Sequence, residues 1–143
     1  RHRAEEYLLD RRLFRRLSTG EVTKDEWTQF SFPPRWHYDV LRGLDYFRKA
    51  GAGPDERCEE AVALVESKRR PDGRWFLENT YPGRVYFAMD DGDGMPSRWN
   101  TLRALRVLAW YRGPRPTKRL MVSSGTAWRT EVGKMAIGMT DEQ

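Results

Sequence analysis

Leu102-Arg103-Ala104-Leu105-Arg106-Val107-Leu108-Ala109-Trp110-Tyr111 is a segment in which only two arginines interrupt a run of apolar residues. Apolar side chains therefore cover nearly the whole circumference of the helix that it would form, and such a helix is buried in a globular protein. Pro96-Ser97, just upstream, is typical of the start of a helix. The segment predicts a buried helix that begins after Pro96-Ser97 and ends near Tyr111.

An internal repeat links this segment to an earlier one. Leu41-Arg42-Gly43-Leu44 matches Leu102-Arg103-Ala104-Leu105 at an offset of 61 residues. Upstream, Pro34-Arg35-Trp36 is similar to Pro96-Ser97-Arg98-Trp99, and Trp27 and Trp75 occur early in the two preceding connections. Three matches in register indicate a repeated unit. Each unit consists of an outer helix, a tryptophan-bearing loop, an entrance of the Pro-x-Arg-Trp kind and an inner helix.

Three further helices follow from the spacing of apolar residues. We expect the first from about residue 4 to 17, the second from about 35 to 50, and the third after Pro54-Asp55, where Asp55 can cap it. Their apolar rows are Leu9, Leu13 and Leu17 in the first, Trp36, Val40, Leu44 and Phe47 in the second, and Cys58, Ala61, Val62 and Val65 in the third. The first and third have broad polar faces, so exposed and buried helices should alternate along the chain.

The predicted fold is all-α, a series of helical hairpins with long loops and at most one short strand or hairpin. Its burial predictions are Trp36, Leu44, Leu105 and Leu108 inside, and Arg12, Arg16 and Glu59 outside. The connections, about residues 18 to 34 and 70 to 97, are long for a compact domain. Alternation at 84 to 89 suggests a short strand. We assign residues 1–112 to the helical domain and 113–143 to a C-terminal tail, in which 132 to 139 could form a short helix.

The composition favours a packed globular domain. Among 143 residues 13% are aromatic, with six Trp, which argues against disorder. The net charge is +5, but acidic residues are interspersed with the basic ones throughout. The dense basic run, Arg11, Arg12, Arg15 and Arg16, shares its predicted helix with apolar residues, so a solvated helix face is the favoured interpretation. No nucleic-acid-binding module accompanies it, and no nucleic-acid partner is expected.

Cysteine usage and hydropathy limit the remaining classes. Cys58 is the single cysteine, which excludes an intramolecular disulfide and a cysteine-based zinc cluster. A reducing compartment agrees with this, and we expect a cytoplasmic location. No run of about 18 apolar residues occurs, so no membrane span is predicted. The chain begins at Arg1 inside a helical pattern, and we expect it to be a fragment or a processed product.

Several segments resemble a known superfamily. Arg70-Pro71-Asp72-Gly73-Arg74-Trp75, after an amphipathic helix, looks like the Gly-x-Trp end of the repeat in squalene and other triterpene cyclases. Residues 32–39 and 99–105 are similar to inner-helix entrances in bacterial proteins of this terpenoid-cyclase and protein-prenyltransferase superfamily. The resemblance covers about residues 4 to 112. It implies an α/α toroid, in which parallel inner helices surround an apolar cavity; with about two hairpins, the chain would be an arc of the ring or a shortened relative.

The family's catalytic motifs are not matched. Ser67, Lys68 and Arg69 stand near the place of the repeat's glutamine, and Asp90-Asp91-Gly92-Asp93-Gly94 orders its aspartates differently from the Asp-x-Asp-Asp motif of class II cyclases. Prenyltransferases bind zinc through Asp, Cys and His. Asp55 and Cys58 are close in sequence here, but neither His2 nor His37 is an obvious third ligand. We therefore expect no catalytic residue, metal or cofactor to carry over.

Two other polar groups have alternative interpretations. Asp90, Asp91 and Asp93 could bind a divalent cation, but they lack the spacing of an EF-hand, and a solvated turn is favoured. His37, beside Asp39, could transfer protons. Sequence neighbours on a helix do not face each other, so structural packing of His37 is favoured.

The strongest ligand-site candidate is the pair of inner-helix entrances. Arg35 and Arg98 should lie at the same end of the molecule, at the N-termini of roughly parallel helices that favour anions. The candidate ligand-binding residues are Arg35, Trp36, His37, Tyr38, Asp39, Arg98, Trp99 and Asn100. In the alternative, each arginine pairs with a nearby acid and each tryptophan fills the ring. Arg42 and Arg103, at one repeat position, either line the ring or bridge to neighbouring helices.

The sequence leaves three functional classes open. The first is an isoprenoid-handling enzyme or its remnant, which the resemblance implies. The second is a noncatalytic module that binds an isoprenoid or other apolar, anionic small molecule, or a partner. The third is a structural or protein-interaction fragment of a larger toroid protein. In each case an arc leaves the sides of its terminal hairpins open, so we expect self-association or a partner that covers these edges.

Overall fold

A computed structural model describes residues 1–113 of the chain. It contains four α-helices: α1 (His2–Asp10), α2 (Val40–Lys49), α3 (Glu59–Ser67) and α4 (Arg98–Arg112). Two 3-10 turns, η1 (Asp25–Thr28) and η2 (Glu56–Cys58), lie in the connections. Strands β1 (Trp75–Phe76) and β2 (Pro96–Ser97) form a two-stranded antiparallel sheet. The predicted helical class, with one short hairpin-like pair of strands, is thus confirmed.

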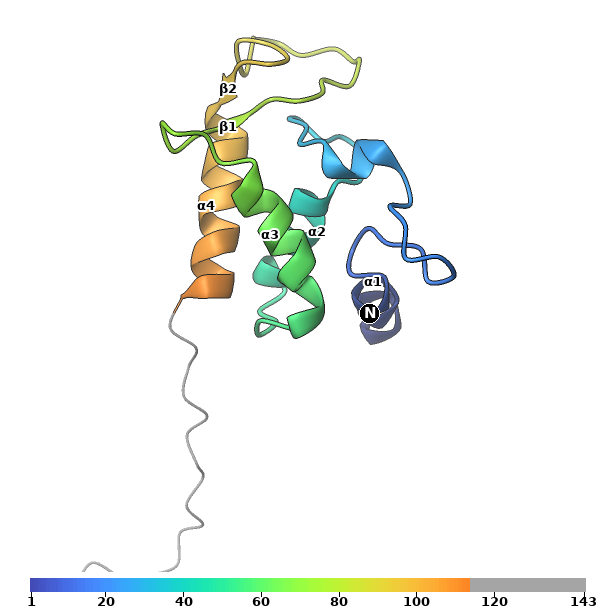
Figure 1. Cartoon of the computed structure of the whole chain (residues 1–143). Helices are drawn as coiled ribbons and strands as arrows, with labels where there is room; N and C mark the ends of the chain where they lie inside the picture. Colours follow the sequence, from blue (N-terminus) through green and yellow to red (C-terminus); the bar gives the residue numbers. More distant parts are fainter. Residues whose placement is uncertain (114–143) are drawn as a thin grey trace, which may run out of the picture.

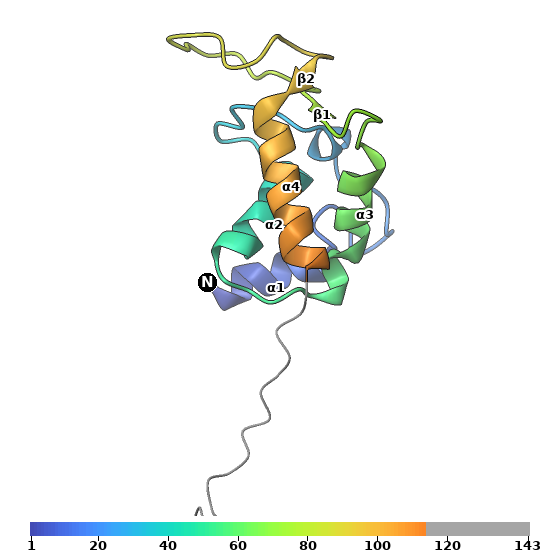
Figure 2. The same cartoon turned by 90° about the vertical axis from the view of Figure 1, so that its left-hand side faces the viewer.

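The helices α2, α3 and α4 alternate in direction along the chain. Figures 1 and 2 show α2 and α4 running in the same direction, with α3 returning the chain between them in sequence. The helix α1 lies near the C-terminal end of α2, where Arg1 donates a hydrogen bond to the Ala50 carbonyl (3.1 Å). The loop that joins β1 to β2 lies over the opposite end, beside the start of α4.

One apolar core holds these elements together. Every helix contributes to it, and so do Phe30 and Trp75 from the loops. Its fully enclosed side chains include Leu13, Phe30, Val40, Leu41, Leu44, Val62, Val65, Trp75 and Val107. Trp75 ties three elements together, because its indole donates to the Val65 carbonyl (2.7 Å) and its backbone N–H donates to the Thr101 hydroxyl (3.0 Å). The predicted inward face of α3, from Cys58 to Val65, is confirmed.

The first helix ends earlier than its leucine row predicts. Arg12 and Leu13 adopt left-handed backbone conformations, with φ of 46° and 71°, so the chain leaves the helix after Asp10. Backbone hydrogen bonds then run to a neighbouring segment, from Thr23 to the Phe14 carbonyl and from Arg16 to that of Glu21. The turn buries both Leu13 and Phe14, whereas Leu17, the expected end of the row, is exposed. The predicted helix from 4 to 17 is wrong in its second half.

The second helix begins later than predicted. Asp39 is its N-cap and accepts a hydrogen bond from the Arg42 backbone N–H at 2.7 Å. Arg35 has a φ of 49°; residues 35 and 36 form a turn, and residues 37–39 are extended or irregular instead of helical. Trp36 is consequently 76% exposed, and its predicted burial is wrong.

The fourth helix is buried on one face only. Asn100, Ala104, Val107 and Tyr111 form its buried row. On the opposite side Leu102 and Leu105 remain 39% and 43% exposed, because no described element covers them, and Leu108 is partly buried. The expectation of a helix buried all round, with Leu105 in the core, is wrong.

Other predictions have mixed outcomes. Leu44 is buried and Arg12, Arg16 and Glu59 are exposed, as predicted. Residues 84–89 form no strand, and the sheet lies at 75–76 and 96–97 instead. The tail, with its suggested helix at 132–139, falls outside the described residues apart from residue 113. Within residues 1–113, no helix has the length and apolar character needed to cross a membrane.

Candidate ligand-binding site between α2 and α4

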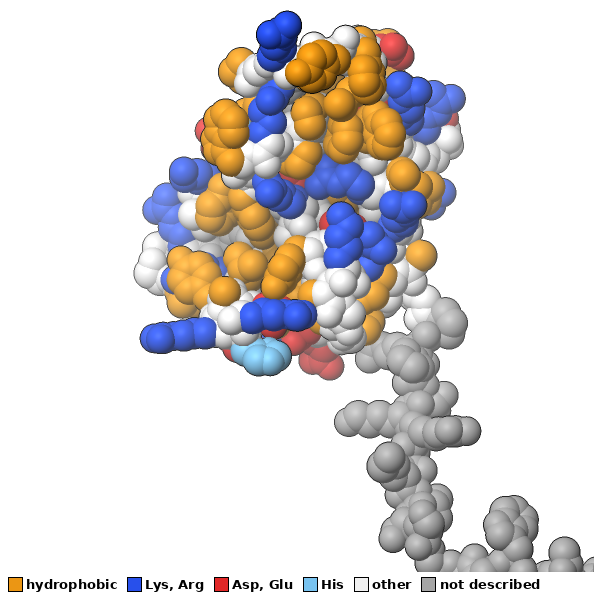
Figure 3. Space-filling model, turned by 180° about the vertical axis from the view of Figure 1, so that it is seen from behind, with side chains coloured by type: hydrophobic (Ala, Val, Ile, Leu, Met, Phe, Trp, Pro, Cys, Tyr) orange, Lys and Arg blue, Asp and Glu red, His pale blue; other side chains and the backbone are white. Residues whose placement is uncertain are grey.

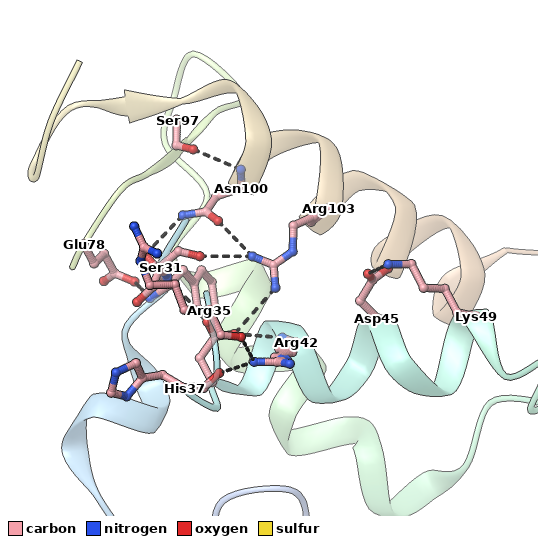
Figure 4. Close-up of polar contacts among 12 residues, drawn as sticks. Ser31, Arg35, His37, Arg42, Asp45, Lys49, Glu78, Ser97, Asn100 and Arg103 are labelled. Atoms are coloured by element: carbon pink, nitrogen blue, oxygen red, sulfur yellow. Dashed lines mark hydrogen bonds and ion pairs between the residues drawn. The ribbon is translucent and has the colours of Figure 1, made fainter. Parts of the chain in front are cut away.

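Arg103 is the centre of a polar network where the first turns of α2 and α4 meet (Figure 4). Its guanidinium donates to the Ser31 carbonyl (3.1 Å) and to the Asn100 side-chain oxygen (3.2 Å), and it lies 3.9 Å from the Asp39 carboxylate. Asn100 is fully buried, and its amide donates to the carbonyls of Phe30 and Phe76. The network therefore joins α4 to the segment that leads into α2.

Asp39 serves this network as a buried cap. Its carboxylate accepts hydrogen bonds from the backbone N–H groups of Arg42 and Ser31. Burial raises the pKa of Asp39, although Arg103 and these donors favour the charged form. Burial likewise lowers the pKa of Arg103. Because every contact of the carboxylate is internal, it holds the start of α2 and is not presented to a ligand.

Arg42 binds the backbone that precedes its own helix, α2. Its guanidinium donates to the carbonyls of Arg35 (2.7 Å) and His37 (2.6 Å), just before α2. Arg103, by contrast, binds the Ser31 carbonyl in the segment before the other helix, α2. Bridging to a neighbouring helix, one of the two roles predicted for this repeat position, is therefore confirmed for Arg103 and not for Arg42, and both side chains line a groove.

The groove lies between α2 and α4 and has a volume of about 350 Å³. It is lined by Phe32, Pro34, Arg42, Asp45, Lys49, Trp99, Leu102, Arg103 and Arg106. The rings of Phe32 and Trp99 are stacked, with centroids 5.1 Å apart and planes 11° apart, and form an apolar shelf with Leu102. On the face seen in Figure 3, hydrophobic side chains gather directly beside Lys and Arg side chains.

Cations of the groove differ in how far they are neutralised. Lys49 forms an ion pair with Asp45 (2.7 Å), and Arg42 and Arg103 bind backbone carbonyls. Arg106 is exposed and, within residues 1–113, its side chain makes no hydrogen bond or ion pair. Among the cations that line the groove, Arg106 is therefore the one whose guanidinium is free to bind an anion.

Arg35 and Arg98 lie before or at the starts of parallel helices, and each binds the same long loop. Arg35 donates to the Arg84 carbonyl (3.4 Å), and its guanidinium packs so close to Gly83 that a Cβ there would lie 2.3 Å from it. Arg98 donates twice to the Met89 carbonyl, at 3.2 and 3.0 Å. Both arginines thus bind loop backbone, and within residues 1–113 neither pairs with a buried acid.

The N-terminus of α4 is already occupied by a carboxylate of the chain. Ser97 caps the helix by accepting from the Asn100 N–H (3.0 Å). Asp90 accepts from the Ser97 hydroxyl and from the Arg98 backbone N–H. An external anion at this helix end would therefore have to displace Asp90.

The remaining candidates face different surroundings. The ring of His37 stacks on Tyr81, with centroids 3.4 Å apart. Tyr38 contacts Trp27 edge to face and donates to the Leu13 carbonyl (2.8 Å), on the α1 side of α2. Trp36 is exposed beside His37. Of the candidate residues, only Trp99 lines the groove.

Asp90, Asp93 and Asp55 make contacts within the chain, and Cys58 is buried. Asp90 accepts hydrogen bonds from Ser97 and the Arg98 backbone N–H, and Asp93 accepts one from Thr80. Asp55 caps η2 and pairs with Arg57, while burial raises the pKa of Cys58 to about 12. Among the described residues, no three His, Cys, Asp or Glu side chains are grouped so that they could hold an ion.

No family model, curated protein or solved structure matches this chain. The groove residues Phe32, Leu102 and Arg106 were not among the sequence candidates. Leu102 and Arg106 were not considered as surface residues because the helix that contains them was predicted to be fully buried. For Arg106 the repeat could have indicated a role in the groove. It aligns Arg106 with Asp45, and both polar residues line the groove.

Proposed function

We propose that this chain is a noncatalytic binding module for an elongated apolar molecule with an anionic group. The apolar part would lie on the shelf of Phe32, Trp99 and Leu102, and Arg106 would bind the anion. The observation that carries the proposal is an unpaired arginine next to stacked, partly exposed rings in one groove. A guanidinium can bind a phosphate or carboxylate through two parallel hydrogen bonds.

The resemblance to triterpene cyclases and prenyltransferases suggests an isoprenoid diphosphate as the probe. The resemblance implies a ligand whose anionic end lies beside an apolar surface between parallel helices, and the proposed ligand has the same two parts. The binding role is favoured over catalysis because Asp39, a buried carboxyl with a raised pKa, is closed off by Ser31, Arg42 and Arg103.

Calorimetric titration of the full chain with farnesyl diphosphate, farnesol and inorganic pyrophosphate tests this proposal. The intact diphosphate should bind most tightly, because it alone uses both the shelf and Arg106. Arg106→Gln should weaken binding by roughly tenfold or more, the effect of losing charge-assisted hydrogen bonds worth about 1.5–3 kcal/mol. Arg3→Gln, at an exposed arginine far along the sequence in α1, is the matched control.

A second pair of variants tests the shelf. Trp99→Ala should weaken binding of both farnesyl compounds and leave that of pyrophosphate unchanged. Trp36→Ala removes a more exposed tryptophan that does not line the groove, and should have no effect. The proposal would be abandoned if farnesyl diphosphate gave no binding heat, or if Arg106→Gln bound it as tightly as the wild type.

A further inference from the structure

A loop after α1 exposes six consecutive residues to solvent. Arg15 and Val22 form an isolated antiparallel bridge, and residues 16–21 form the loop between them. Two backbone hydrogen bonds made by Arg16, each 2.8 Å long, close this loop. Every residue from 16 to 21 is exposed, so the loop contributes no side chain to the core. Such a loop can open locally at little cost to the rest of the fold.

Ser18 lies within this loop, and two arginines precede it. Arg15 and Arg16 stand three and two positions before the serine, and Leu17 stands directly before it. Within residues 1–113 the Ser18 hydroxyl makes no hydrogen bond, so its oxygen is free to react. Protein kinases discriminate among substrates by their charge pattern. A pair of arginines shortly before an exposed serine is the pattern that suits a kinase with an acidic peptide cleft.

A hollow of about 490 Å³ lies beside the same loop. It is lined by Asp10, Arg12, Arg15, Arg16, Leu17, Gly20 and Glu60. Glu60, on α3, forms an ion pair with Arg15 and lies 3.8 Å from Arg12. One carboxylate thus serves two guanidiniums on this side of the hollow.

The other charges of the hollow leave it with an excess of cations. Asp10 forms an ion pair with Arg57 at 3.0 Å, outside the lining. Arg16 donates to the Thr23 carbonyl at 3.4 Å and, in the described part of the chain, pairs with no carboxylate. An anion added beside Leu17 and Gly20, which flank Ser18 in the sequence, would therefore find guanidinium groups that are not fully neutralised.

We propose that Ser18 is a phosphorylation site for an arginine-directed serine kinase, and that Arg12 and Arg16 bind the phosphate once it is attached. The Ser18 oxygen attacks the γ-phosphorus of ATP. A new O–P bond forms, the bond to the departing ADP oxygen breaks, and the hydroxyl proton passes to the catalytic aspartate of the kinase.

The attached phosphate matches the charge and the donors of the hollow. It carries a charge of about −1.5 to −2 at pH 7 and three acceptor oxygens, which suit guanidinium donors. Among the described residues, the hollow and the groove between α2 and α4 have no lining residue in common. The proposal therefore goes beyond ligand binding and does not depend on it.

Phosphorylation of the folded full chain by the catalytic subunit of cyclic-AMP-dependent protein kinase, an arginine-directed enzyme, tests the acceptor. Tryptic mapping should place the phosphate on Ser18 in the wild type and in Thr19→Ala, and Ser18→Ala should receive none within residues 17–24. Arg16→Gln should slow the transfer roughly tenfold, because a charge-assisted contact with the kinase is lost. Arg11→Gln, in the same basic run but outside these two positions, is the matched control and should leave the rate unchanged.

A synthetic peptide of residues 11–24 shows how far the fold restricts the reaction. The full chain should be phosphorylated at a rate within about tenfold of the peptide's, because the loop opens without exposing the core. A slower reaction of the chain, or a phosphate on Thr19 in place of Ser18, would overturn the assignment. Thermal melts monitored by circular dichroism establish that each variant is folded.

Phosphorus-31 NMR of the phosphorylated chain tests where the phosphate binds. Nearby guanidiniums favour its doubly charged form, so its second pKa should lie below the usual value of about 6. Arg12→Gln removes one cation of the hollow and should raise this pKa, whereas Arg11→Gln should not, because Arg11 packs on the Tyr7 ring and does not line the hollow. Equal pKa values in the wild type and Arg12→Gln would overturn the role of the hollow.

Discussion

The carboxylate of Asp39 lies 3.9 Å from the guanidinium of Arg103, and both side chains are almost fully enclosed where α2 meets α4. Asp39 is also the N-cap of α2. One side chain thus satisfies the free N–H of a helix start and balances a buried cation on another helix.

Asp39→Ala should therefore destabilise the fold strongly. Loss of the cap costs about 1 kcal/mol, and a buried cation left without its partner costs about 3–5 kcal/mol. Asp39→Asn keeps a capping oxygen that can also accept from Arg103, so its cost should be clearly smaller. Urea denaturation followed by tryptophan fluorescence measures both. A loss below about 1 kcal/mol for the alanine variant would contradict the assigned role.

Asp39 should also give stability a characteristic pH dependence. Burial raises its pKa in the folded state above the value of about 3.9 for an unfolded chain. The folded state therefore binds the proton more tightly, and stability falls as pH rises from the unfolded pKa through the folded one. The difference in unfolding free energy between wild type and Asp39→Asn should show this fall. A difference that stays flat or rises with pH would contradict it.

Leu44 and Leu105 occupy equivalent repeat positions but should differ in their effect on stability. Leu44→Ala removes a fully buried side chain and should cost about 2–5 kcal/mol. Leu105 is 43% exposed, and Leu105→Ala should cost less than about 1 kcal/mol when the chain is dilute. Chemical denaturation at low protein concentration compares them. Equal losses would place Leu105 in the core after all.

The Cys58 thiol should be inert in the native protein. It is 1% exposed, and burial raises its pKa to about 12, so almost no thiolate exists at neutral pH. Ellman's reagent should release no colour from the folded chain and one equivalent per chain in concentrated guanidinium. Prompt reaction without denaturant would show that η2 and α3 open readily.

The sequence predicted which segments are helical but not where two of them end. Apolar spacing identifies α3 and α4 well, because their buried rows follow the helical period. It cannot detect that Arg12 and Leu13 turn left-handed, since an i, i+4 row continues through them. It also placed the start of the second helix at about residue 35, whereas Asp39 is the N-cap in the structure.

For the candidate site, the repeat was more informative than individual residues. It placed Arg42 and Arg103 at one repeat position; in the structure Arg103 bridges to the segment before α2, whereas Arg42 binds backbone before its own helix. It could not predict that the loop carbonyls of Arg84 and Met89 would engage Arg35 and Arg98, because loop conformation is not encoded by periodicity. For the same reason the sequence could not predict that the ring of Phe32 stacks on that of Trp99.

The side chain of Asn100 binds the carbonyl of Phe30, 70 residues earlier in the chain. Such a contact forms only after a long loop has closed, and proteins dominated by distant contacts fold slowly. During translation the first three helices are synthesised before α4. Until α4 is made, the apolar surface of α2 around Leu41 and Leu44 lacks the helix that packs against it. A nascent chain at this stage is vulnerable to aggregation, and a pause in translation before residue 98 would prolong that vulnerability.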